Sequence, residues 1–382
     1  MSPSCYLFES WEASFILGES GIIGYVIGYE SWMIEPQINV SQELLKLITE
    51  LDEFKGKWEL LKTMSPKRLA QLRKVATIES IGSSTRIEGA KLSDAEVEIL
   101  LSNLQTISFK TRDEEEVAGY AEAIDMVFQA YDDLRITENH IRQLHQVLLK
   151  HSNKDERHRG SYKTLSNQVV ATNAEGEEIG VIFETTTPCD TPQEMEELVK
   201  WARKAIDEDA MHPLLIIAVF NVVFLAIHPF QDGNGRLSRI LITLMLLRAG
   251  YDYVPYESLE HIVEDSKDLY YKALRRTQIA LKTASVDWEP WLRFFLRCLK
   301  QQKSNLELKI EDKKTKYDAD LPILSKKVLQ LFETHEQLAI SEMVKLTGAN
   351  QNTLKLRLRE LVSAELLQRH GKARATWYSR PA

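Results

Sequence analysis

Two nearly continuous apolar segments in the middle of the chain form its clearest hydrophobic pattern. Residues 213–227 are almost wholly apolar, and residues 237–247 are mostly apolar again, with Gly250 just beyond their end. Apolar runs of this length, without the alternation of a half-exposed strand, are typical of buried helices. The pattern therefore predicts two buried helices joined by the short loop between them.

Amphipathic spacing predicts further helices on both sides of this pair. Apolar positions recur at helical spacing through residues 40–61, and a second such segment begins at Pro66 and includes Leu69. A third helix is expected over residues 94–104, and most of the chain as far as Lys300 has helical periodicity. We therefore expect a mainly α fold.

A loose alternation of polar and apolar positions covers residues 167–172 and 180–185. The sequence Asn-Ala-Glu-Gly at residues 173–176 lies between them and has the composition of a turn. These features predict a β-hairpin. Short hairpins are common, so the pattern alone also suits an ordinary surface hairpin.

A charge-rich stretch at residues 301–320 is expected to connect two domains. The segment after it, residues 321–382, has the order of elements of a winged helix-turn-helix, with Asn350 as a favourable N-cap and a wing around Gly371. The expected helices cover residues 325–334, 340–346 and 351–364, and the expected strands cover residues 366–369 and 376–379.

The charge of this C-terminal segment differs from that of the rest of the chain. Its ten Lys and Arg residues against five Glu give +5, so the other residues carry −13 of the total of −8. A positive domain fits DNA contact, with Gln351, Asn352 and Lys355 opening the expected recognition helix. Winged helices also serve as protein-interaction or dimerisation modules, and the fold alone does not decide between these uses.

The first 32 residues contain no Lys or Arg, so they lack the basic start of a secretory signal. We treat residues 1–32 as an extension of uncertain role and Met33 as a candidate initiator. The expected organisation continues with an N-terminal helical region at residues 33–139 and a core at residues 140–300, followed by the connector and the C-terminal domain.

Composition restricts the expected partners and location. A net charge of −8 and a pI near 5.7 argue against a general nucleic-acid or membrane-surface binder, so a protein target is expected. Cys5, Cys189 and Cys298 are scattered and match neither a disulfide framework nor a zinc site, which favours a reducing cytoplasm. Residues 213–227 fall short of the roughly 20 that a bilayer crossing needs, so no membrane span is expected.

The loop between the two apolar helices concentrates the residues that bear chemistry. Pro229 ends the first helix and leaves His228 at its rim, where a side chain with an ordinary pKa of about 6.5 can accept a proton near neutral pH. Gly233 and Gly235 allow positive φ, so successive backbone N–H groups can form an anion-binding nest, to which the amide of Asn234 can add.

Two cations and a carboxylate complete this loop. Arg236 and Arg239 lie one turn apart at a helix N-terminus, where the macrodipole disfavours cations by roughly 0.3–1 kcal/mol each. A polyphosphate would compensate them, and Asp232 is then the natural ligand for a bridging Mg²⁺. Each fragment alone is an ordinary helix stop, turn or solvated face. Their combination at this spacing predicts a nucleoside-triphosphate site.

The run from His228 to Arg239 resembles the signature of the Fic family, His-Pro-Phe-x-Asp/Glu-Gly-Asn-Gly/Lys-Arg-x-x-Arg, with every specified position filled. Most members transfer AMP from ATP to a Ser, Thr or Tyr hydroxyl of a protein. The resemblance implies a Fic-type helical bundle in which the hairpin is a flap that aligns the target by strand addition. The site residues that it implies are His228 as general base, Asp232 as Mg²⁺ ligand, Gly233, Asn234, Gly235, Arg236, Leu237 and Ser238 around the nucleotide phosphates, Arg239 on the γ-phosphate, and Tyr271 beside the adenine.

Single positions refine what the resemblance implies. Doc-type relatives, which use the nucleotide as a phosphate donor, carry Lys where Gly235 stands, so Gly235 favours nucleotide transfer. Asn221 and Lys163 stand where many relatives have a histidine and an arginine. These departures leave the catalytic set intact and bear on substrate choice.

A second motif lies far upstream, where Ser84, Glu88 and Gly89 resemble the family's inhibitory helix, Ser/Thr-x-x-x-Glu-Gly/Asn. Alone, a glutamate before a glycine is an ordinary helix end. A carboxylate reaching Arg239 would form a bidentate ion pair with the group that should hold the γ-phosphate. The resemblance therefore implies self-inhibition, and in some relatives the same glutamate supports removal of AMP.

Two classes of function follow from these observations. The first is a self-inhibited protein adenylyltransferase that uses ATP and Mg²⁺ to modify a hydroxyl of a protein, itself included. The alternative is a DNA-binding regulator in which the Fic module senses nucleotide. Within the enzyme class, removal of AMP and transfer of UMP or another nucleotide stay open, and the family resemblance implies a homodimer.

Overall fold

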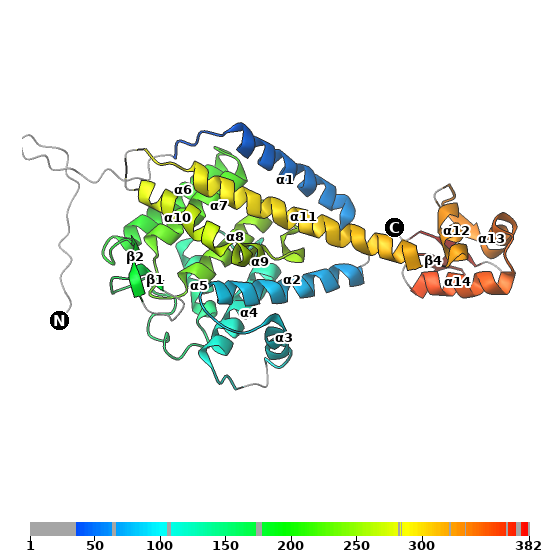
Figure 1. Ribbon diagram of the computed structural model, residues 1–382, viewed down its shortest axis with the longest axis horizontal. Helices are drawn as coiled ribbons and strands as arrows, with labels where there is room; N and C mark the ends of the chain where they lie inside the picture. The colour runs from blue at the N-terminus through cyan, green and yellow to red at the C-terminus, as the bar shows by residue number, and fades with distance from the viewer. Residues whose placement is uncertain are drawn as a thin grey trace, which may run out of the picture.

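The fold is mainly helical, as predicted, in a computed structural model (Figure 1). The structure describes residues 36–62, 66–104, 108–172, 178–281, 283, 285–320, 322–332, 334–363, 366–371 and 376–380. The extension at residues 1–32, the candidate initiator Met33 and the expected hairpin turn at residues 173–176 lie outside these ranges.

A large helical domain carries the elements expected to form the site. Its elements are α1 (Gln42–Leu61), α2 (Pro66–Ile87), α3 (Asp94–Ser102), α4 (Arg112–Ala130), α5 (Glu138–Leu148), β1 (Gln168–Thr172), β2 (Glu178–Glu184), α6 (Thr191–Asp207), α7 (Pro213–Ile227), α8 (Asn234–Arg248), the 3₁₀ helix η1 (Val254–Tyr256), α9 (Leu259–Asp265), α10 (Lys267–Ala280) and α11 (Glu289–Asp320). The antiparallel pair β1–β2 is the predicted hairpin.

Helices α7 and α8 lie at the centre of this domain. Residues 214–227 of α7 are all buried, and the helix packs against α6, α8, α10 and α11. The bounds of α7 are those predicted from its apolar pattern, whereas α8 begins at Asn234, before the predicted start at Leu237. Because both helices are held by packing over their length, the loop between them has fixed ends.

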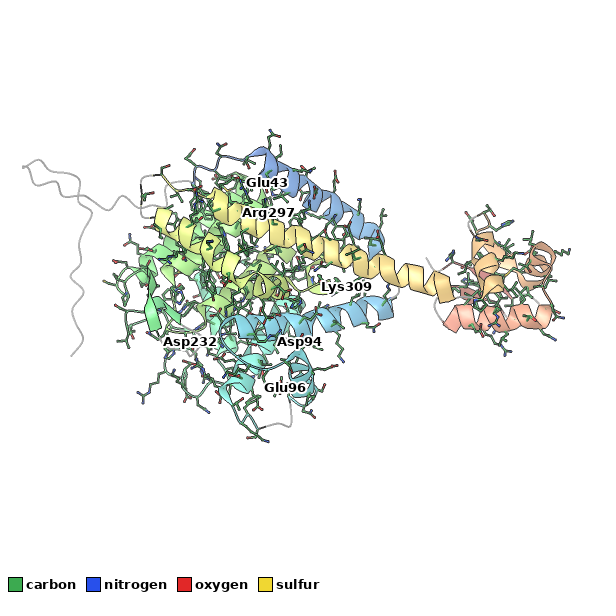
Figure 2. All side chains as sticks on the ribbon, in the orientation of Figure 1. Glu43, Asp94, Glu96, Asp232, Arg297 and Lys309 are labelled. Carbon is green, nitrogen blue, oxygen red and sulfur yellow. The ribbon has the colours of Figure 1, made fainter. Side chains whose placement is uncertain are left out.

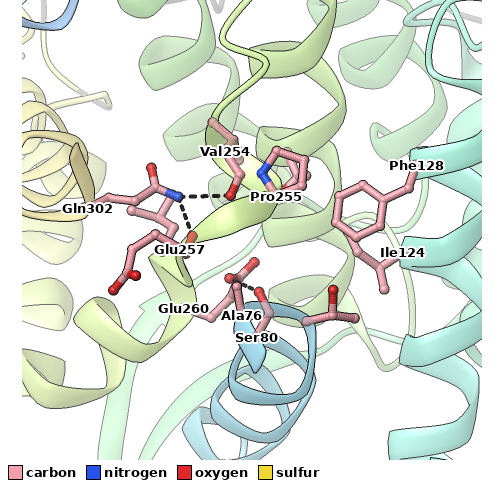
Figure 3. Close-up of a pocket in the computed structure, with 12 residues that line it drawn as sticks. Ala76, Ser80, Ile124, Phe128, Val254, Pro255, Glu257, Glu260 and Gln302 are labelled. Atoms are coloured by element: carbon pink, nitrogen blue, oxygen red, sulfur yellow. Dashed lines mark hydrogen bonds between the residues drawn. The ribbon is translucent and has the colours of Figure 1, made fainter. Parts of the chain in front are cut away.

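Helix α2, which carries Ser84, is held against the domain by buried polar contacts. Ser80 donates a hydrogen bond to Glu260 of α9, and the hydroxyl of Tyr120 on α4 donates to the other carboxylate oxygen at 3.2 Å. Figure 3 shows the pocket at this contact, whose lining includes Ala76, Ser80 and Glu260 and no residue of the loop between α7 and α8. This pocket therefore lies at the contact that anchors α2 and is not part of the loop between α7 and α8.

Helix α11 begins in the core and continues toward the C-terminal domain (Figure 1). Arg297 forms an ion pair with Glu43 of α1 at 2.5 Å, and Figure 2 labels both side chains. Further along, Leu306 and Ile310 are buried in the main core, and Arg68 of α2 donates a 2.6 Å hydrogen bond to the Ile310 carbonyl. The stretch at residues 301–320, expected to be a connector, is thus a continuation of α11 that is packed over its first half.

The C-terminal elements form a smaller domain with its own core. They are α12 (Ile323–Leu331), β3 (Gln337–Ala339), α13 (Ile340–Thr347), α14 (Gln351–Ser363), β4 (Gln368–His370) and β5 (Trp377–Ser379), with the antiparallel strand order β3-β5-β4. Leu354 and Leu358 of α14 pack with Val328 of α12 in this core. Asn350 accepts a hydrogen bond from the backbone of Asn352 at 2.8 Å, the contact expected of an N-cap.

Within the described ranges, no helix combines the length and the apolar character that a bilayer crossing requires.

Candidate functional site

His228 lies at the C-terminal end of α7. Its N–H donates to the Phe224 carbonyl at 2.9 Å, and its backbone is left-handed, with φ 52° and ψ 60°. The residue before Pro229 was expected to leave the helical region, and it does so into the left-handed rather than the usual extended conformation. Such a backbone costs about 1–3 kcal/mol in a residue other than glycine, so the surrounding packing must impose it.

The imidazole of His228 is half-buried, and its lowered pKa favours the neutral form at physiological pH. Burial, followed by the charge of Lys163, lowers the pKa of His228 to about 4, against the opposing effects of Glu88 and Asp232. A neutral imidazole has a lone pair that can accept a proton from a hydroxyl. The group expected to be the base is therefore in the protonation state that a base needs.

The two glycines of the loop have different roles. Gly233 precedes α8 with φ 79°, but Gly235 lies within the first turn of α8 and has no positive φ, so that expectation for Gly235 is wrong. A Cβ on Gly235 would lie 2.1 Å from Oε1 of Glu88, closer than real contacts allow. The missing side chain thus makes room for the carboxylate of Glu88, which directly follows α2.

The side chain of Asn234 orders the loop. Its Oδ1 accepts from the N–H of Phe230 at 2.9 Å, and its Nδ2 donates to the carbonyl of the same residue at 2.7 Å. The amide was expected to join a phosphate cradle, but both of its polar ends are used by Phe230. The donors left for an anion are the first backbone N–H groups of α8, which no intrahelical bond uses.

Asp232 lies in a ring of alternating charges. Its Oδ2 accepts from Arg112 at 2.6 Å, and its Oδ1 accepts from the Gly233 N–H at 2.6 Å and from Arg236 at 3.2 Å. Glu116 closes the ring, 2.7 Å from Arg112 and 3.1 Å from Arg236. Burial raises the pKa of Asp232, but Arg236, the Gly233 N–H and Arg112 outweigh it and the net pKa is lowered. The carboxylate is therefore ionised.

This carboxylate fits a Mg²⁺ ion that arrives with a nucleotide. The described part of the chain contains no group of three or more His, Cys, Asp or Glu side chains that could hold a metal by itself. Mg²⁺ usually binds through one or two carboxylates together with substrate phosphates, which matches the single acid here. The Arg112 side chain is 46% exposed, so it can leave Asp232 without disturbing the core.

Arg239 is bound by Ser84 of α2 and by Glu88, the residue that directly follows α2. Its Nε donates to the Ser84 hydroxyl at 2.7 Å, and its Nη2 donates to the Ser84 carbonyl and to Oε1 of Glu88, both at 2.8 Å. Burial raises the pKa of Glu88, but the charge of Arg239 outweighs it and the net pKa is lowered. The expected bidentate pair is not formed, because Ser84 takes the second nitrogen. Glu88 and Arg239 nevertheless meet as charged partners.

Gly89 ends the segment that carries Glu88, with φ 107°, a value that favours glycine. The negative charge expected around the two arginines comes from the chain itself in this structure: Glu88 compensates Arg239, and Asp232 compensates Arg236.

The remaining expected site residues have supporting positions. The Leu237 N–H bonds to the Gly233 carbonyl at 2.9 Å, and the Ser238 hydroxyl donates to the Gly235 carbonyl at 2.8 Å, so both stabilise the start of α8. Tyr271 lies on α10. Burial raises the pKa of its hydroxyl, and the charge of Glu88 raises it further, so Tyr271 is in electrostatic contact with the site.

Sequence reasoning missed the residues that hold the loop from outside, and His145 of α5 is the clearest case. Its Nδ1 accepts from the Gly160 N–H at 2.8 Å, its Nε2 lies 2.9 Å from the Asp232 carbonyl, and its ring stacks on Phe230 at 3.8 Å. A lone histidine on an amphipathic helix gives no sequence signal. The four-residue spacing of Arg112 and Glu116 could have indicated their mutual pair, but not their contacts with the loop.

Comparison with known proteins gives consistent matches. Residues 135–246 match the sequence model of the Fic/DOC family. The protein adenylyltransferase Fic of Drosophila persimilis is 28% identical over 236 residues, 61% of this chain and 41% of that protein, and that of Drosophila grimshawi is 27% identical over 232 residues, 60% and 43%. The chain thus spans about two fifths of the length of these curated relatives.

Solved structures support the fold. A Fic family protein from Desulfovibrio desulfuricans superimposes with a TM-score of 0.59 at 20% identity, covering 91% of this chain and 98% of that one. A Fic-domain signalling protein from Bacteroides thetaiotaomicron gives a TM-score of 0.56 at 24% identity, covering 69% and 96%.

Proposed function

Because this chain carries a Fic domain, we propose that it is a self-inhibited protein adenylyltransferase, which transfers AMP from Mg-ATP to a Ser, Thr or Tyr hydroxyl of a protein, itself included. The observation that carries the proposal is the convergence of His228, Asp232 and Arg239 around the N-terminus of α8. A neutral imidazole, an ionised carboxylate and a buried guanidinium at one helix start suit phosphoanhydride chemistry.

The nucleotide binds with its phosphates at the start of α8. The backbone N–H groups there and Arg236 hold the phosphate oxygens, and Arg239 takes the γ-phosphate once Glu88 has left it. Asp232 would hold the Mg²⁺ ion that arrives with the nucleotide, and the bound ion would neutralise part of the phosphate charge. Tyr271 contacts the adenine.

His228 then removes the proton from the target hydroxyl. The hydroxyl oxygen attacks the α-phosphorus, the bond to the bridging oxygen of the β-phosphate breaks, and pyrophosphate leaves while AMP stays on the target oxygen. Positioning and charge stabilisation provide most of the acceleration.

Glu88 restrains this reaction. While it holds Arg239, the γ-phosphate lacks its partner and the triphosphate is misplaced for in-line attack.

Incubation with ATP labelled at the α-phosphate tests the proposal in cell lysate. We expect weak labelling of protein by the wild type, strong labelling by Glu88→Gly, and none by His228→Ala. Absence of labelled protein with Glu88→Gly and Mg²⁺ would exclude transfer of AMP. Other labelled triphosphates in the same assay test nucleotide preference, and release of AMP from pre-labelled protein tests the reverse reaction.

A second candidate function is DNA binding through the C-terminal domain, which stays a winged-helix prediction. Gln351, Asn352, Lys355 and Arg359 of α14 are all exposed, which suits contact with a groove. Fluorescence anisotropy of the full chain with a labelled 30-bp duplex tests it. We expect the affinity for DNA to fall as the salt concentration rises and to fall in the double variant Lys355→Glu/Arg359→Glu. If the chain shows no salt-sensitive binding, DNA binding by this domain is excluded.

A homodimer and a cytoplasmic location stay predictions of the sequence. Light scattering coupled to size-exclusion chromatography tests the first, and cell fractionation tests the second.

A further inference from the structure

Lys163 lies between the base of the β1–β2 hairpin and the end of α7, with only 3% of its surface exposed. Its Nζ donates three hydrogen bonds of 2.9 Å each, to the Asn167 side-chain oxygen, the Thr185 hydroxyl and the Ile227 carbonyl. An ammonium has three N–H donors, and each has an acceptor here. Burial lowers the pKa of Lys163 to about 8. A buried charge is costly, so this residue does more than fill space.

The segment that begins at Lys163 also binds the backbone around His228. The Lys163 N–H donates to the Pro229 carbonyl at 2.8 Å, and the Asn167 side-chain amide donates to the Phe230 carbonyl at 2.9 Å. With the bond from Nζ to Ile227, carbonyls on both sides of the left-handed His228 are held by one short segment.

The same contacts join the two ends of the hairpin. Asn167 directly precedes β1, and Thr185 directly follows β2. The Thr185 hydroxyl lies 2.7 Å from the Asn167 side-chain oxygen and 2.8 Å from its carbonyl. Lys163 binds both residues, so its ammonium links the base of the hairpin to the end of the helix that carries His228.

We propose that Lys163 is a positioning residue that sets the hairpin in register with His228, so that a polypeptide segment added to the hairpin presents its hydroxyl to the imidazole. This inference rests on the proposed function, since it assigns the hairpin to the polypeptide target. Loss of the ammonium would let the hairpin shift while the triphosphate site stays intact. Transfer of AMP to polypeptide should then suffer more than transfer to water, which needs no hairpin.

The ratio of AMP on protein to AMP released into water tests the proposal, because partial unfolding lowers both products equally and leaves their ratio unchanged. The full chain carrying Glu88→Gly is the parent, assayed with α-labelled ATP. We expect Lys163→Met to lower the ratio about tenfold or more, since a misplacement of 1 Å can cost up to about 100-fold. Lys163→Arg should restore most of it, and the KM for ATP should stay unchanged.

Two further variants complete the design. Thr185→Val keeps the ammonium and the side-chain shape but removes one acceptor, and we expect it to lower the ratio in the same direction. Lys150→Met is the matched control, because Lys150 is an exposed lysine paired with Glu122 and should leave the ratio unchanged.

Equal loss of both products in Lys163→Met would overturn the positioning role and leave Lys163 as a support of the fold. If that variant does not fold, an unchanged ratio in Thr185→Val overturns the inference instead. A parent that forms neither product would refute the proposed function itself, which is a different result from a parent that forms both in a ratio insensitive to Lys163.

Discussion

Glu88 and Arg239 are separated by 151 positions in the chain, and their side chains meet at 2.8 Å. The arginine side chain is 5% exposed, whereas the glutamate side chain is 32% exposed. Ser84, one turn earlier on α2, binds the same guanidinium through its hydroxyl and its carbonyl. Glu88 can therefore swing toward solvent while Arg239 stays in place, which suits a contact that is meant to open.

Replacing Glu88 by Gly should raise the rate of AMP transfer at least tenfold. The substitution frees Nη2 of Arg239 for the γ-phosphate, and correct placement of a reacting group is worth one to two orders of magnitude. Transfer of label from α-labelled ATP measures the rate. Glu98→Gly, which removes an exposed glutamate paired with Lys74, is the matched control. A Glu88→Gly enzyme as slow as the wild type would contradict self-inhibition by this residue.

Without nucleotide, the Glu88→Gly variant should be less stable than the wild type, and nucleotide binding should stabilise it more. Arg239 is buried, and a buried charge that loses its partner costs up to roughly 3–5 kcal/mol. We expect a lower Tm for Glu88→Gly alone and a larger rise in Tm on adding Mg-ATP than the wild type shows. Differential scanning fluorimetry measures both values, and equal shifts in the two proteins would count against competition between Glu88 and the γ-phosphate.

His228→Ala should lower AMP transfer by about 100-fold or more in the Glu88→Gly background, the usual effect of losing a general base. Nucleotide affinity should change little, because His228 caps the end of α7, whereas the proposed phosphate donors lie at the start of α8. Rapid-quench kinetics and calorimetric titration separate the two effects. A variant that loses rate only in proportion to its loss of ATP affinity would indicate a role for His228 in binding.

Arg112→Gln should tighten binding of a Mg-nucleotide by roughly two- to fivefold, the range of an exposed ion pair. Arg112 occupies Oδ2 of Asp232, so its removal exposes that oxygen to Mg²⁺. Calorimetry with a non-hydrolysable ATP analogue, with and without Mg²⁺, measures the change, and only the Mg²⁺ form should gain. Weaker binding of both forms would instead show that Arg112 holds the phosphates directly.

Stability should respond to pH through Glu260, a buried carboxyl that anchors α2. Burial raises the pKa of Glu260 above its ordinary value of 4.5, despite the hydrogen bond from Ser80. Between the ordinary pKa of the unfolded state and the raised pKa of the folded state, the folded chain binds more protons than the unfolded chain. Glu260 therefore adds stability as the pH falls, and this contribution is lost as the pH rises through the pKa of the folded state.

Glu260→Gln removes this titration, and we expect the difference in free energy of unfolding between wild type and variant to shift in favour of the wild type as the pH falls from 7 toward 4.5. Urea unfolding at several pH values measures it. A difference that does not vary with pH would show that the carboxyl titrates normally.

Local pattern was enough to predict most of the elements and to name the loop residues expected to form the site. The apolar run of α7 gave its bounds, and the loop that follows showed His228, Asp232, Arg236 and Arg239 together, because periodicity and turn chemistry are properties of neighbouring residues. The hairpin and the N-cap at Asn350 follow from the same local rules.

The sequence by itself thus determined the helical class, the loop and its motif, since these depend on contacts within a few residues. Only the tertiary structure decided that the side chain of Asn234 binds the loop backbone rather than a ligand. It also decided that a glycine stands at 235 because a side chain there would collide with Glu88, and not because the backbone needs a positive φ. Likewise, only the structure shows that Lys163 links the hairpin to α7. The first contact is local, between residues four positions apart, but the fold of the loop decides it. The other two join segments tens to more than a hundred residues apart, and packing of whole helices sets them, so no spacing along the chain can encode which atoms finally meet.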